Sequence, residues 1–299
     1  RQFRLPYDVL YEVQMVGYLE ELRNVGLRSR EDGMAEFEAV RRNVYLHRRE
    51  NTWDCGGEAH ACDCPEPPLG QMGCLEGCSN RAMYEECSPR LCRLGARCGN
   101  QALQRRSDQA KNLQLVDMGA KGLGLVARCA IRQGSLLGEY VGEVMTEEMW
   151  QEKQVKRGNS ERHKYVMNLG GGEVIDASRH GGLMRFVNHS CGPNAETQKW
   201  LVAGEWRIGL VTVRGLEPGE EVTFDYQYVR YDEEPRECLC GHPRCKGWLG
   251  RAADSAVEER DDGSSTSWGD GSGDATGSDS GFDCSSSSDG EGAATAGSG

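Results

Sequence analysis

The chain has 299 residues, of which 37% are hydrophobic and 27% charged, so it is long enough to bury the core of one large domain or two small ones. This composition excludes a chain that is disordered throughout. The formal net charge is −12, but residues 254–299 hold 11 of the 47 acidic side chains and only 1 of the 35 Lys and Arg side chains. The acidity therefore belongs to the C-terminal tail, and the rest of the chain is nearly neutral.

No stretch approaches the roughly 20 apolar residues of a membrane-spanning helix, and no basic-then-apolar signal segment opens the chain. We therefore expect neither membrane insertion nor export. The first residue is Arg1 rather than Met, so we interpret the chain as a fragment or a processed product.

The first 98 residues divide into two segments of different composition. Apolar side chains recur at helical spacing, as at Val9 and Val13 and again at Val40 and Val44, and they predict one or two helices in an N-terminal extension, residues 1–54. Between residues 55 and 98, eight cysteines stand among Gly, Pro and short polar links. That stretch has too few apolar residues to bury an ordinary core.

From residue 111 to residue 226, short β-rich runs separated by glycines predict a mainly β domain of small curled sheets. The runs are residues 113–116, 123–127, 135–140, 165–169, 208–213 and 221–224. One helix is expected over residues 146–155, although Thr146 and Met149 do not form a full capping box. Beyond residue 253, where Gly and Ser supply 22 of the last 46 residues, we expect a disordered acidic tail, residues 253–299.

The cysteines form two clusters with metal-ligand spacing. Seven thiols lie within 37 residues, in the pattern Cys62-x-Cys64, Cys74-x3-Cys78 and Cys87-x4-Cys92-x5-Cys98. Disulfides cannot pair an odd number of thiols, whereas two tetrahedral zinc ions that share one bridging thiolate use seven ligands. The second cluster, Cys238-x-Cys240-x4-Cys245, needs a fourth ligand, for which Cys191 is the candidate. Closed four-thiolate sites leave no position for a substrate water, so we interpret the metal as structural.

Three of the fourteen cysteines remain. We predict that Cys129 is a buried core thiol and that Cys284 lies in the disordered tail. Cys55 is a spare thiol, with His60 nearby as a competing ligand. So many thiols with metal spacing favour a reducing, intracellular compartment.

Three short segments carry candidate chemistry: residues 121–124 (Lys-Gly-Leu-Gly), residues 185–191 (Arg-Phe-Val-Asn-His-Ser-Cys) and residues 224–226 (Phe-Asp-Tyr). Taken singly, they are typical of a turn, a local hydrogen-bond site and a strand end in the core. In this order, and flanked by both cysteine clusters, they resemble the SET-domain lysine methyltransferases. The resemblance covers about residues 60–250. Residues 43–46, 194–200 and 224–231 are most similar to the class that methylates lysine 36 of histone H3.

The resemblance implies a fold of small curled β-sheets with a pseudoknot, in which the strand with Asn188 and His189 and the strand with Tyr226 thread together. It also implies a domain order. Residues 55–105 resemble the associated-with-SET zinc module, residues 106–235 the SET domain and residues 236–252 the post-SET zinc module. The cofactors implied are S-adenosyl-L-methionine and three structural zinc ions.

The site follows residue by residue from the same resemblance, with Tyr226 as the catalytic tyrosine. The cofactor pocket would be lined by Lys121, Gly122, Leu123, His163, Lys164, Tyr165, Asn188, His189, Arg236 and Leu239. The substrate channel would be lined by Phe224, Tyr165 and Arg230, the last of these as a plug at the channel mouth. The chain departs from the family at Leu123, where Trp is frequent, and at Lys164, where Tyr is common.

Methyl transfer from a sulfonium to an amine needs no metal and no covalent nucleophile, so positioning is the main task. An apolar, aromatic channel penalises the ammonium form of lysine and so favours the neutral amine. The Tyr226 hydroxyl and nearby carbonyls would orient the amine. Phe224 adds no hydroxyl that would hold the amine or a water, so we predict a product beyond monomethyl-lysine.

Residues 81–132 hold ten Lys or Arg and four acids, a local charge of +6. We interpret this segment as a surface for nucleosomal DNA, with a solvated zinc-module surface as the alternative. The acidic tail either reaches basic histone segments or keeps the chain soluble. The histone H3 tail is the expected protein partner and chromatin in the nucleus the expected location.

Three functions remain open from the sequence. The first is a methyltransferase acting on lysine 36 of histone H3 in nucleosomes, and the second applies the same chemistry to another protein lysine. The third is a catalytically inactive, zinc-stabilised interaction module that kept the fold. Retention of Tyr226, Asn188 and His189 favours the first two.

Overall fold

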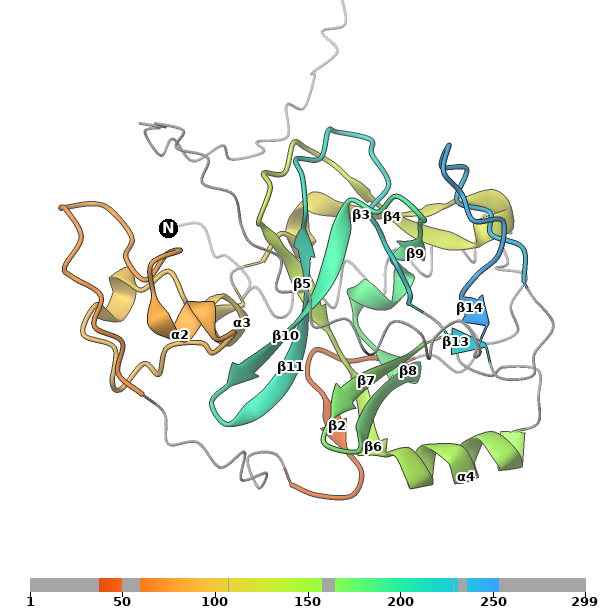
Figure 1. Ribbon diagram of the computed structural model, residues 1–299, viewed down its shortest axis with the longest axis horizontal. Coiled ribbons are helices and arrows are strands. Elements are labelled where there is room, and N and C mark those ends of the chain that lie inside the picture. Colours follow the sequence, from red (N-terminus) through yellow and green to blue (C-terminus); the bar gives the residue numbers. More distant parts are fainter. Residues whose placement is uncertain are drawn as a thin grey trace, which may run out of the picture.

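The computed structural model describes residues 38–49, 60–106, 108–157, 165–227, 229–230 and 236–252, without the side chains of residues 229–230 and 251–252. Within these ranges the protein is mainly β, with short strands and few helices, as predicted (Figure 1). The described strands are β1 (Glu38–Ala39), β2 (Val44–Tyr45), β3 (Leu113–Asp117), β4 (Leu123–Ala127), β5 (Leu136–Tyr140), β6 (Gly142–Thr146), β7 (Val166–Gly170), β8 (Glu173–Gly181), β9 (Asn188–His189), β10 (Ala195–Val202), β11 (Glu205–Thr212), β12 (Thr223–Phe224), β13 (Val229–Arg230) and β14 (Arg251–Ala252).

The helical elements are short except for one. They are α2 (Ser79–Ala82), α3 (Ala102–Arg105) and α4 (Glu147–Arg157), and the 3-10 helices η2 (Gly95–Arg97), η3 (Ala110–Asn112), η4 (Gly119–Lys121) and η6 (Leu183–Phe186). The predicted helix over residues 146–155 is thus confirmed as α4. The Thr146 hydroxyl accepts a hydrogen bond from the Met149 backbone N–H at 3.3 Å, so it caps the helix without a capping box. None of the described helices has the length and apolarity that crossing a membrane requires.

Five small sheets make up the described part of the chain. The largest has the order β1-β8-β6-β2, and β7 also pairs with β8; β1 and β2 join it in parallel and the remaining pairs are antiparallel. The second has the antiparallel order β10-β11-β5. Two-stranded pairs complete the set: β3 with β4, β9 with β12 and β13 with β14.

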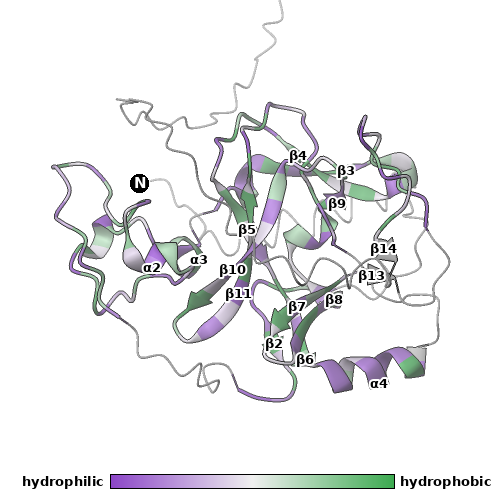
Figure 2. Ribbon diagram, in the orientation of Figure 1, coloured by the Kyte–Doolittle hydropathy of each residue, from purple (hydrophilic) through white to green (hydrophobic). Residues whose placement is uncertain are grey.

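The central sheets and the segments between them share one apolar core. Leu125, Leu137, Ile175, Leu210 and Val222 come from different segments of the chain and are each 0% exposed. In Figure 2, hydrophobic colour concentrates on the central strands, whereas α4 at the edge is mostly hydrophilic. The cysteine-rich segment with α2 and α3 lies at one end of the molecule, and the C-terminal segment with β14 lies at the opposite end (Figure 1). This arrangement puts a metal-ligating module on each side of the central sheets.

The N-terminal expectation is partly wrong. Residues 1–37 and 50–59, with Val9, Val13 and Cys55, lie outside the described residues. Residues 38–49, where Val40 and Val44 contributed to the helical spacing, form β1 and β2 instead of a helix. These strands pair in parallel with β8 and β6, and the hydrogen bonds of a sheet edge override weak helical periodicity in so short a segment.

The strand predictions hold best where the run is compact and apolar. Strands β3, β4, β5, β7 and β11 coincide with five of the predicted runs, and the sixth shrinks to the two residues of β12. Strands β6, β8 and β10 were not predicted, because charged residues interrupt their apolar pattern. Cys129 is half-buried in a turn after β4, so its prediction as a buried core thiol was wrong. Cys284 and the tail lie outside the described residues.

Candidate active site and metal centres

The Gly-x-Gly turn between η4 and β4 needs its two glycines for different reasons. Gly122 has φ +80°, in the region where L side chains are strained, and a Cβ added there would meet nothing within 4 Å. Gly124 lies in close contact with its neighbours, because an added Cβ would lie 2.8 Å from Asn188 Nδ2 and 3.0 Å from a Glu221 oxygen. The turn thus presents open backbone at Gly122 and packs tightly at Gly124. Such a cradle suits a ligand that approaches backbone groups.

Asn188 joins this turn to β12. Its Nδ2 atom donates to the Leu123 carbonyl at 3.2 Å and to Glu221 Oε1 at 2.9 Å. The other Glu221 oxygen pairs with the Lys121 ammonium. Because a carboxylate only accepts hydrogen bonds, Glu221 fixes the orientation of the Asn188 side-chain amide, with its nitrogen toward Glu221 and the Leu123 carbonyl. Glu221 was not among the predicted site residues. Its one signal in the sequence is that an acidic residue stands in the β-rich run that ends at Phe224.

The pairing of β9 with β12 assembles the centre of the site. The register puts Asn188 opposite Thr223 and His189 opposite Phe224, in parallel. Beyond the strand, the Tyr226 backbone N–H donates to His189 Nδ1 at 3.2 Å. The two segments that the sequence analysis singled out therefore lie side by side, as expected for the predicted juxtaposition of Asn188 and His189 with Tyr226. Burial lowers the pKa of His189, which keeps its imidazole neutral as a hydrogen-bond acceptor.

Tyr226 stands at the border between the core and solvent. Its hydroxyl donates to the Val187 carbonyl at 3.0 Å, and its side chain is 37% exposed. Its ring centroid lies 4.8 Å from that of Phe224, which is 6% exposed, and 5.3 Å from that of His189. Because the phenol proton is committed to Val187, the lone pairs of the phenol oxygen are directed to accept a hydrogen bond from a ligand. The site can therefore orient an N–H group next to an aromatic wall.

Two further tyrosines, Tyr140 and Tyr165, are joined by a hydrogen bond. Tyr140 is 3% exposed, and its hydroxyl donates to the Tyr165 carbonyl at 2.8 Å. Burial raises the pKa of Tyr140 far above its usual range, and Tyr226 and Tyr165 raise it further, while Arg185 lowers it. Tyr140 is therefore a neutral phenol, and its hydrogen bond ties the main chain at Tyr165 to the end of β5.

Several predicted site residues stay untested by this geometry. His163 and Lys164 lie outside the described residues, and so does the side chain of Arg230. Arg236 and Leu239 are exposed, Leu239 to 46%, in the segment that carries Cys238 and Cys240. Their predicted role at the edge of the cofactor pocket remains a prediction.

The N-terminal cysteine cluster has the geometry of a thiolate metal centre. All seven thiols pack together as free cysteines, most of them buried. The Sγ atoms of Cys74 lie 3.5 Å from Cys62 and 3.7 Å from Cys92, and tetrahedral Zn–S bonds of about 2.3 Å would put two sulfurs about 3.8 Å apart. Two overlapping groups of four thiols could each hold an ion: Cys62, Cys64, Cys74 and Cys78, and Cys62, Cys74, Cys87 and Cys92. Cys98 completes the seven through contact with Cys74 and Cys92.

The second centre joins the C-terminal segment to the active-site strand. Cys191, Cys238, Cys240 and Cys245 bring their Sγ atoms within 4.8 Å of one another, so the predicted fourth ligand lies where it was expected. Cys191 Sγ is also 3.5 Å from His189 Nε2. The thiol donor sets of both centres fit zinc. Because Cys191 follows His189 by two residues, the C-terminal centre is tied directly to the active-site strand.

Family models match both the central domain and the N-terminal cysteine cluster. The SET domain matches residues 122–227 and the AWS domain residues 70–106. In solved structures, an active polycomb repressive complex 2 in the stimulated state shares 25% identity and a TM-score of 0.51 over 64% of this chain and 26% of its own. A ctPRC2 structure shares 29% identity and a TM-score of 0.50 over 55% of this chain and 22% of its own. The fold and site thus define a SET-domain protein.

Curated relatives refine this class. Histone-lysine N-methyltransferase Set2 of Drosophila melanogaster is 39% identical over 84% of this chain, and SETD2 of Homo sapiens is 38% identical over 72%. A Cryptococcus neoformans relative named as H3 lysine-36 specific is 38% identical over 72%. The chain spans 11%, 8% and 26% of these relatives' own lengths. The chain belongs to the SET-domain family, as the sequence motifs predicted, and it is similar to histone-lysine methyltransferases.

Proposed function

We propose that this chain is the catalytic part of an S-adenosylmethionine-dependent methyltransferase that acts on lysine 36 of histone H3 in nucleosomes. The observation that carries the proposal is the environment of Tyr226. Its hydroxyl is oriented by Val187, its ring packs on Phe224, and the paired strand brings Asn188 and His189 beside it. These groups form a site that would position an amine.

The residues present fit the cofactor. S-adenosylmethionine, when bound, supplies an electrophilic methyl group on a sulfonium. The open backbone at Gly122 and the fixed amide of Asn188 would hold its polar end, with Lys121, Leu123 and His189 around them. His163, Lys164, Tyr165, Arg236 and Leu239 complete the proposed pocket.

The chain's own residues would then prepare the lysine. The aromatic rings of Phe224 and Tyr165, on the two sides of the proposed channel, would exclude water and favour the neutral amine over the ammonium. The phenol oxygen of Tyr226 accepts one amine N–H and so aims the nitrogen lone pair at the methyl donor. Phe224 is buried and has no hydroxyl, which leaves room for methyl groups on the amine and supports a dimethyl or trimethyl product.

The choice of lysine 36 draws on the relatives. Those named as H3 lysine-36 specific align over 72% to 77% of this chain, and Asn188, His189 and Tyr226 of the proposed site lie inside the matched SET domain. Another protein lysine is the second candidate, because the site chemistry itself is independent of the flanking sequence. The ordered Tyr226 hydroxyl argues against an inactive module. A histone substrate would put the protein on chromatin in the nucleus.

Nucleosomal DNA is a proposed second partner, through the basic segment 81–132. Some of its cations are engaged within the protein: Arg105 donates to the carbonyls of Gly95, Ala96 and Cys98, and Lys121 pairs with Glu221. Arg90 and Arg93 in the cysteine-rich module are exposed. If exposed arginines neutralise phosphates, nucleosome affinity falls steeply with salt, whereas affinity for a free histone peptide falls less.

The deciding experiment is radiolabelled methyl transfer to recombinant nucleosomes. It compares the wild type with Tyr226→Phe, and normal nucleosomes with nucleosomes whose H3 lysine 36 is changed to arginine. We expect label on normal nucleosomes only, and a loss of at least about 100-fold in rate for Tyr226→Phe, the range of a positioned proton-handling group. Tyr84→Phe, an exposed tyrosine of the cysteine-rich module, is the matched control and should keep wild-type activity.

The outcomes separate the parts of the proposal. Label that persists on the altered nucleosome rejects lysine 36 and leaves the methyltransferase chemistry. Wild-type protein that binds the cofactor, measured by calorimetry, but transfers no label to any histone rejects the enzyme in favour of the inactive module.

A further inference from the structure

Arg185 lies buried among the aromatic residues of the site but has no role in the chemistry described so far. It belongs to η6, three residues before Asn188, and is 6% exposed. Its guanidinium carbon lies 3.9 Å from the centroid of the Tyr165 ring and 4.8 Å from that of Phe186. Both distances are within the range of cation–π contacts, which strengthen when the cation is desolvated. Arg185 therefore covers one face of Tyr165.

The backbone around Tyr165 is held by the same group of residues. The Tyr165 carbonyl accepts hydrogen bonds from the Tyr140 hydroxyl at 2.8 Å and from the Ala177 N–H at 2.9 Å. Arg185 Nε donates to the Ala177 carbonyl at 2.9 Å. Ala177 in β8 thus binds Tyr165 through its N–H and binds the arginine that stacks on Tyr165 through its carbonyl. Both the ring and the main chain of Tyr165 depend on this platform.

The fold makes room for this arginine. A Cβ added to Gly181 in β8 would lie 3.0 Å from Arg185 Cδ, so a side chain there would press on the arginine stem. The planar guanidinium can stack on a ring while its edge donates to a carbonyl, which a lysine ammonium cannot do. The geometry thus requires an arginine and not only a positive charge.

We propose that Arg185 is a positioning residue that fixes the Tyr165 wall of the lysine channel and thereby determines how many methyl groups the product carries. The proposal deepens the proposed function and rests on it, since Tyr165 is one wall of the proposed channel. Phe224 and Tyr226, whose rings pack on each other, would form the opposite wall of the proposed channel. A Tyr165 ring released from Arg185 would widen the space around a methylated amine.

The test compares Arg185→Met, which keeps the stem and loses the stacking, with Arg185→Lys, which keeps the charge. Products on nucleosomes are resolved by mass spectrometry at matched total turnover. We expect Arg185→Met to lower kcat/KM roughly tenfold and to raise the share of the higher methylation states by about threefold, with Arg185→Lys intermediate. A second readout is the fluorine resonance of Tyr165 in protein labelled with 3-fluorotyrosine, assigned by Tyr165→Phe. This resonance should move in Arg185→Met.

Arg48→Met is the matched control. Arg48 is also a largely buried arginine that stacks on a tyrosine, 4.3 Å from the Tyr45 centroid. It pairs with Glu173 at the start of β8, whereas Arg185 contacts β8 at Ala177 and lies next to Gly181. It should lose stability without a change in product ratio or in the Tyr165 resonance. Unchanged products and an unmoved Tyr165 resonance in Arg185→Met would overturn the proposal. If the wild type transfers no methyl group, the proposed function fails, and the fluorine resonance still decides whether Arg185 positions Tyr165.

Discussion

Single side chains in this protein connect segments that lie far apart in the sequence. Asn188 and Glu221 are 33 residues apart, and their hydrogen bond fixes which end of the Asn188 amide faces the turn at Gly122 and Leu123. Glu221 also neutralises Lys121, so a residue proposed to line the pocket has its charge compensated by the protein itself. At this scale, hydrogen bonds to neighbouring groups fix the orientations of the Asn188 amide and the Tyr226 hydroxyl.

Glu139 provides a prediction on pH at the same scale. Burial raises the pKa of its carboxyl to about 7, against the lowering effects of Arg207 and Arg106. Between pH 4.5 and 7 the folded state therefore binds more protons than the unfolded state, so the free energy of unfolding falls as pH rises through this window. Glu139→Gln should remove this dependence and stabilise the protein by about 3 kcal/mol at pH 8 but little at pH 4.5.

Urea unfolding of both proteins across this pH range measures the effect. The difference between variant and wild type isolates Glu139 from the other titrating groups. A difference that is constant from pH 4.5 to pH 8 would contradict the raised pKa.

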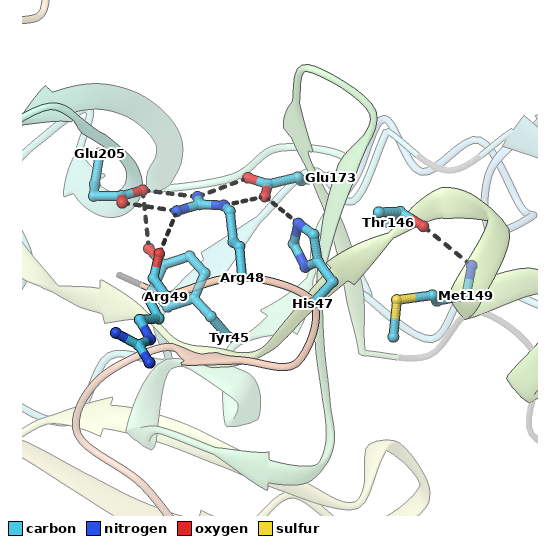
Figure 3. Close-up of polar contacts among 8 residues, drawn as sticks. All are labelled: Tyr45, His47, Arg48, Arg49, Thr146, Met149, Glu173 and Glu205. Carbon is cyan, nitrogen blue, oxygen red and sulfur yellow. Dashed lines mark hydrogen bonds and ion pairs between the residues drawn. The ribbon is translucent and has the colours of Figure 1, made fainter. Parts of the chain in front are cut away.

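At the scale of elements, a segment outside the matched domains locks two hairpins together. Arg48, just after β2, forms a bidentate ion pair with Glu173 at the start of β8 and another with Glu205 at the start of β11 (Figure 3). His47 Nε2 is 2.7 Å from a Glu173 oxygen, and the Tyr45 hydroxyl donates to Glu205 at 3.3 Å. Both carboxylates are buried, and Arg48 is the main partner of their charges.

Arg48→Met should therefore destabilise the protein by about 3 to 5 kcal/mol, because it leaves two buried carboxylates without their main partner. Thermal or urea unfolding measures the loss, with exposed Arg42→Met as the matched control. Adding Glu173→Gln and Glu205→Gln to Arg48→Met should recover much of the stability. A loss below about 1 kcal/mol, typical of surface ion pairs, would show that the network is not needed.

At the scale of the whole molecule, the metal centres replace apolar core at both ends of the central sheets. The N-terminal cluster contributes seven thiols and the C-terminal cluster four, so we predict three zinc ions per chain by elemental analysis. A chelator under reducing conditions should remove metal and activity together, because the C-terminal centre includes Cys191 beside His189. Retention of full activity without metal, or disulfides mapped among Cys62 to Cys98, would refute this account.

Local patterns in the sequence were sufficient for the features that depend on short spacing. The cysteine spacings predicted both thiol clusters, and compact apolar runs predicted strands such as β4 and β5. A helix was also predicted over residues 146–155, where α4 lies. The same reasoning failed for residues 38–49, where pairing at two sheet edges outweighs the helical pattern, and for Cys129, which follows its strand instead of lying in it.

The sequence by itself determined the family, the thiol centres and the identity of the segments that build the site, because each is carried by a motif of a few adjacent residues. Only the tertiary structure decided that Glu221 orients Asn188, that Arg185 covers Tyr165, and that Arg48 joins two sheets across 125 and 157 residues. The physical reason is that an ion pair or a stacked ring depends on distances of a few ångströms, and residues far apart in the chain reach such distances only after the sheets have packed.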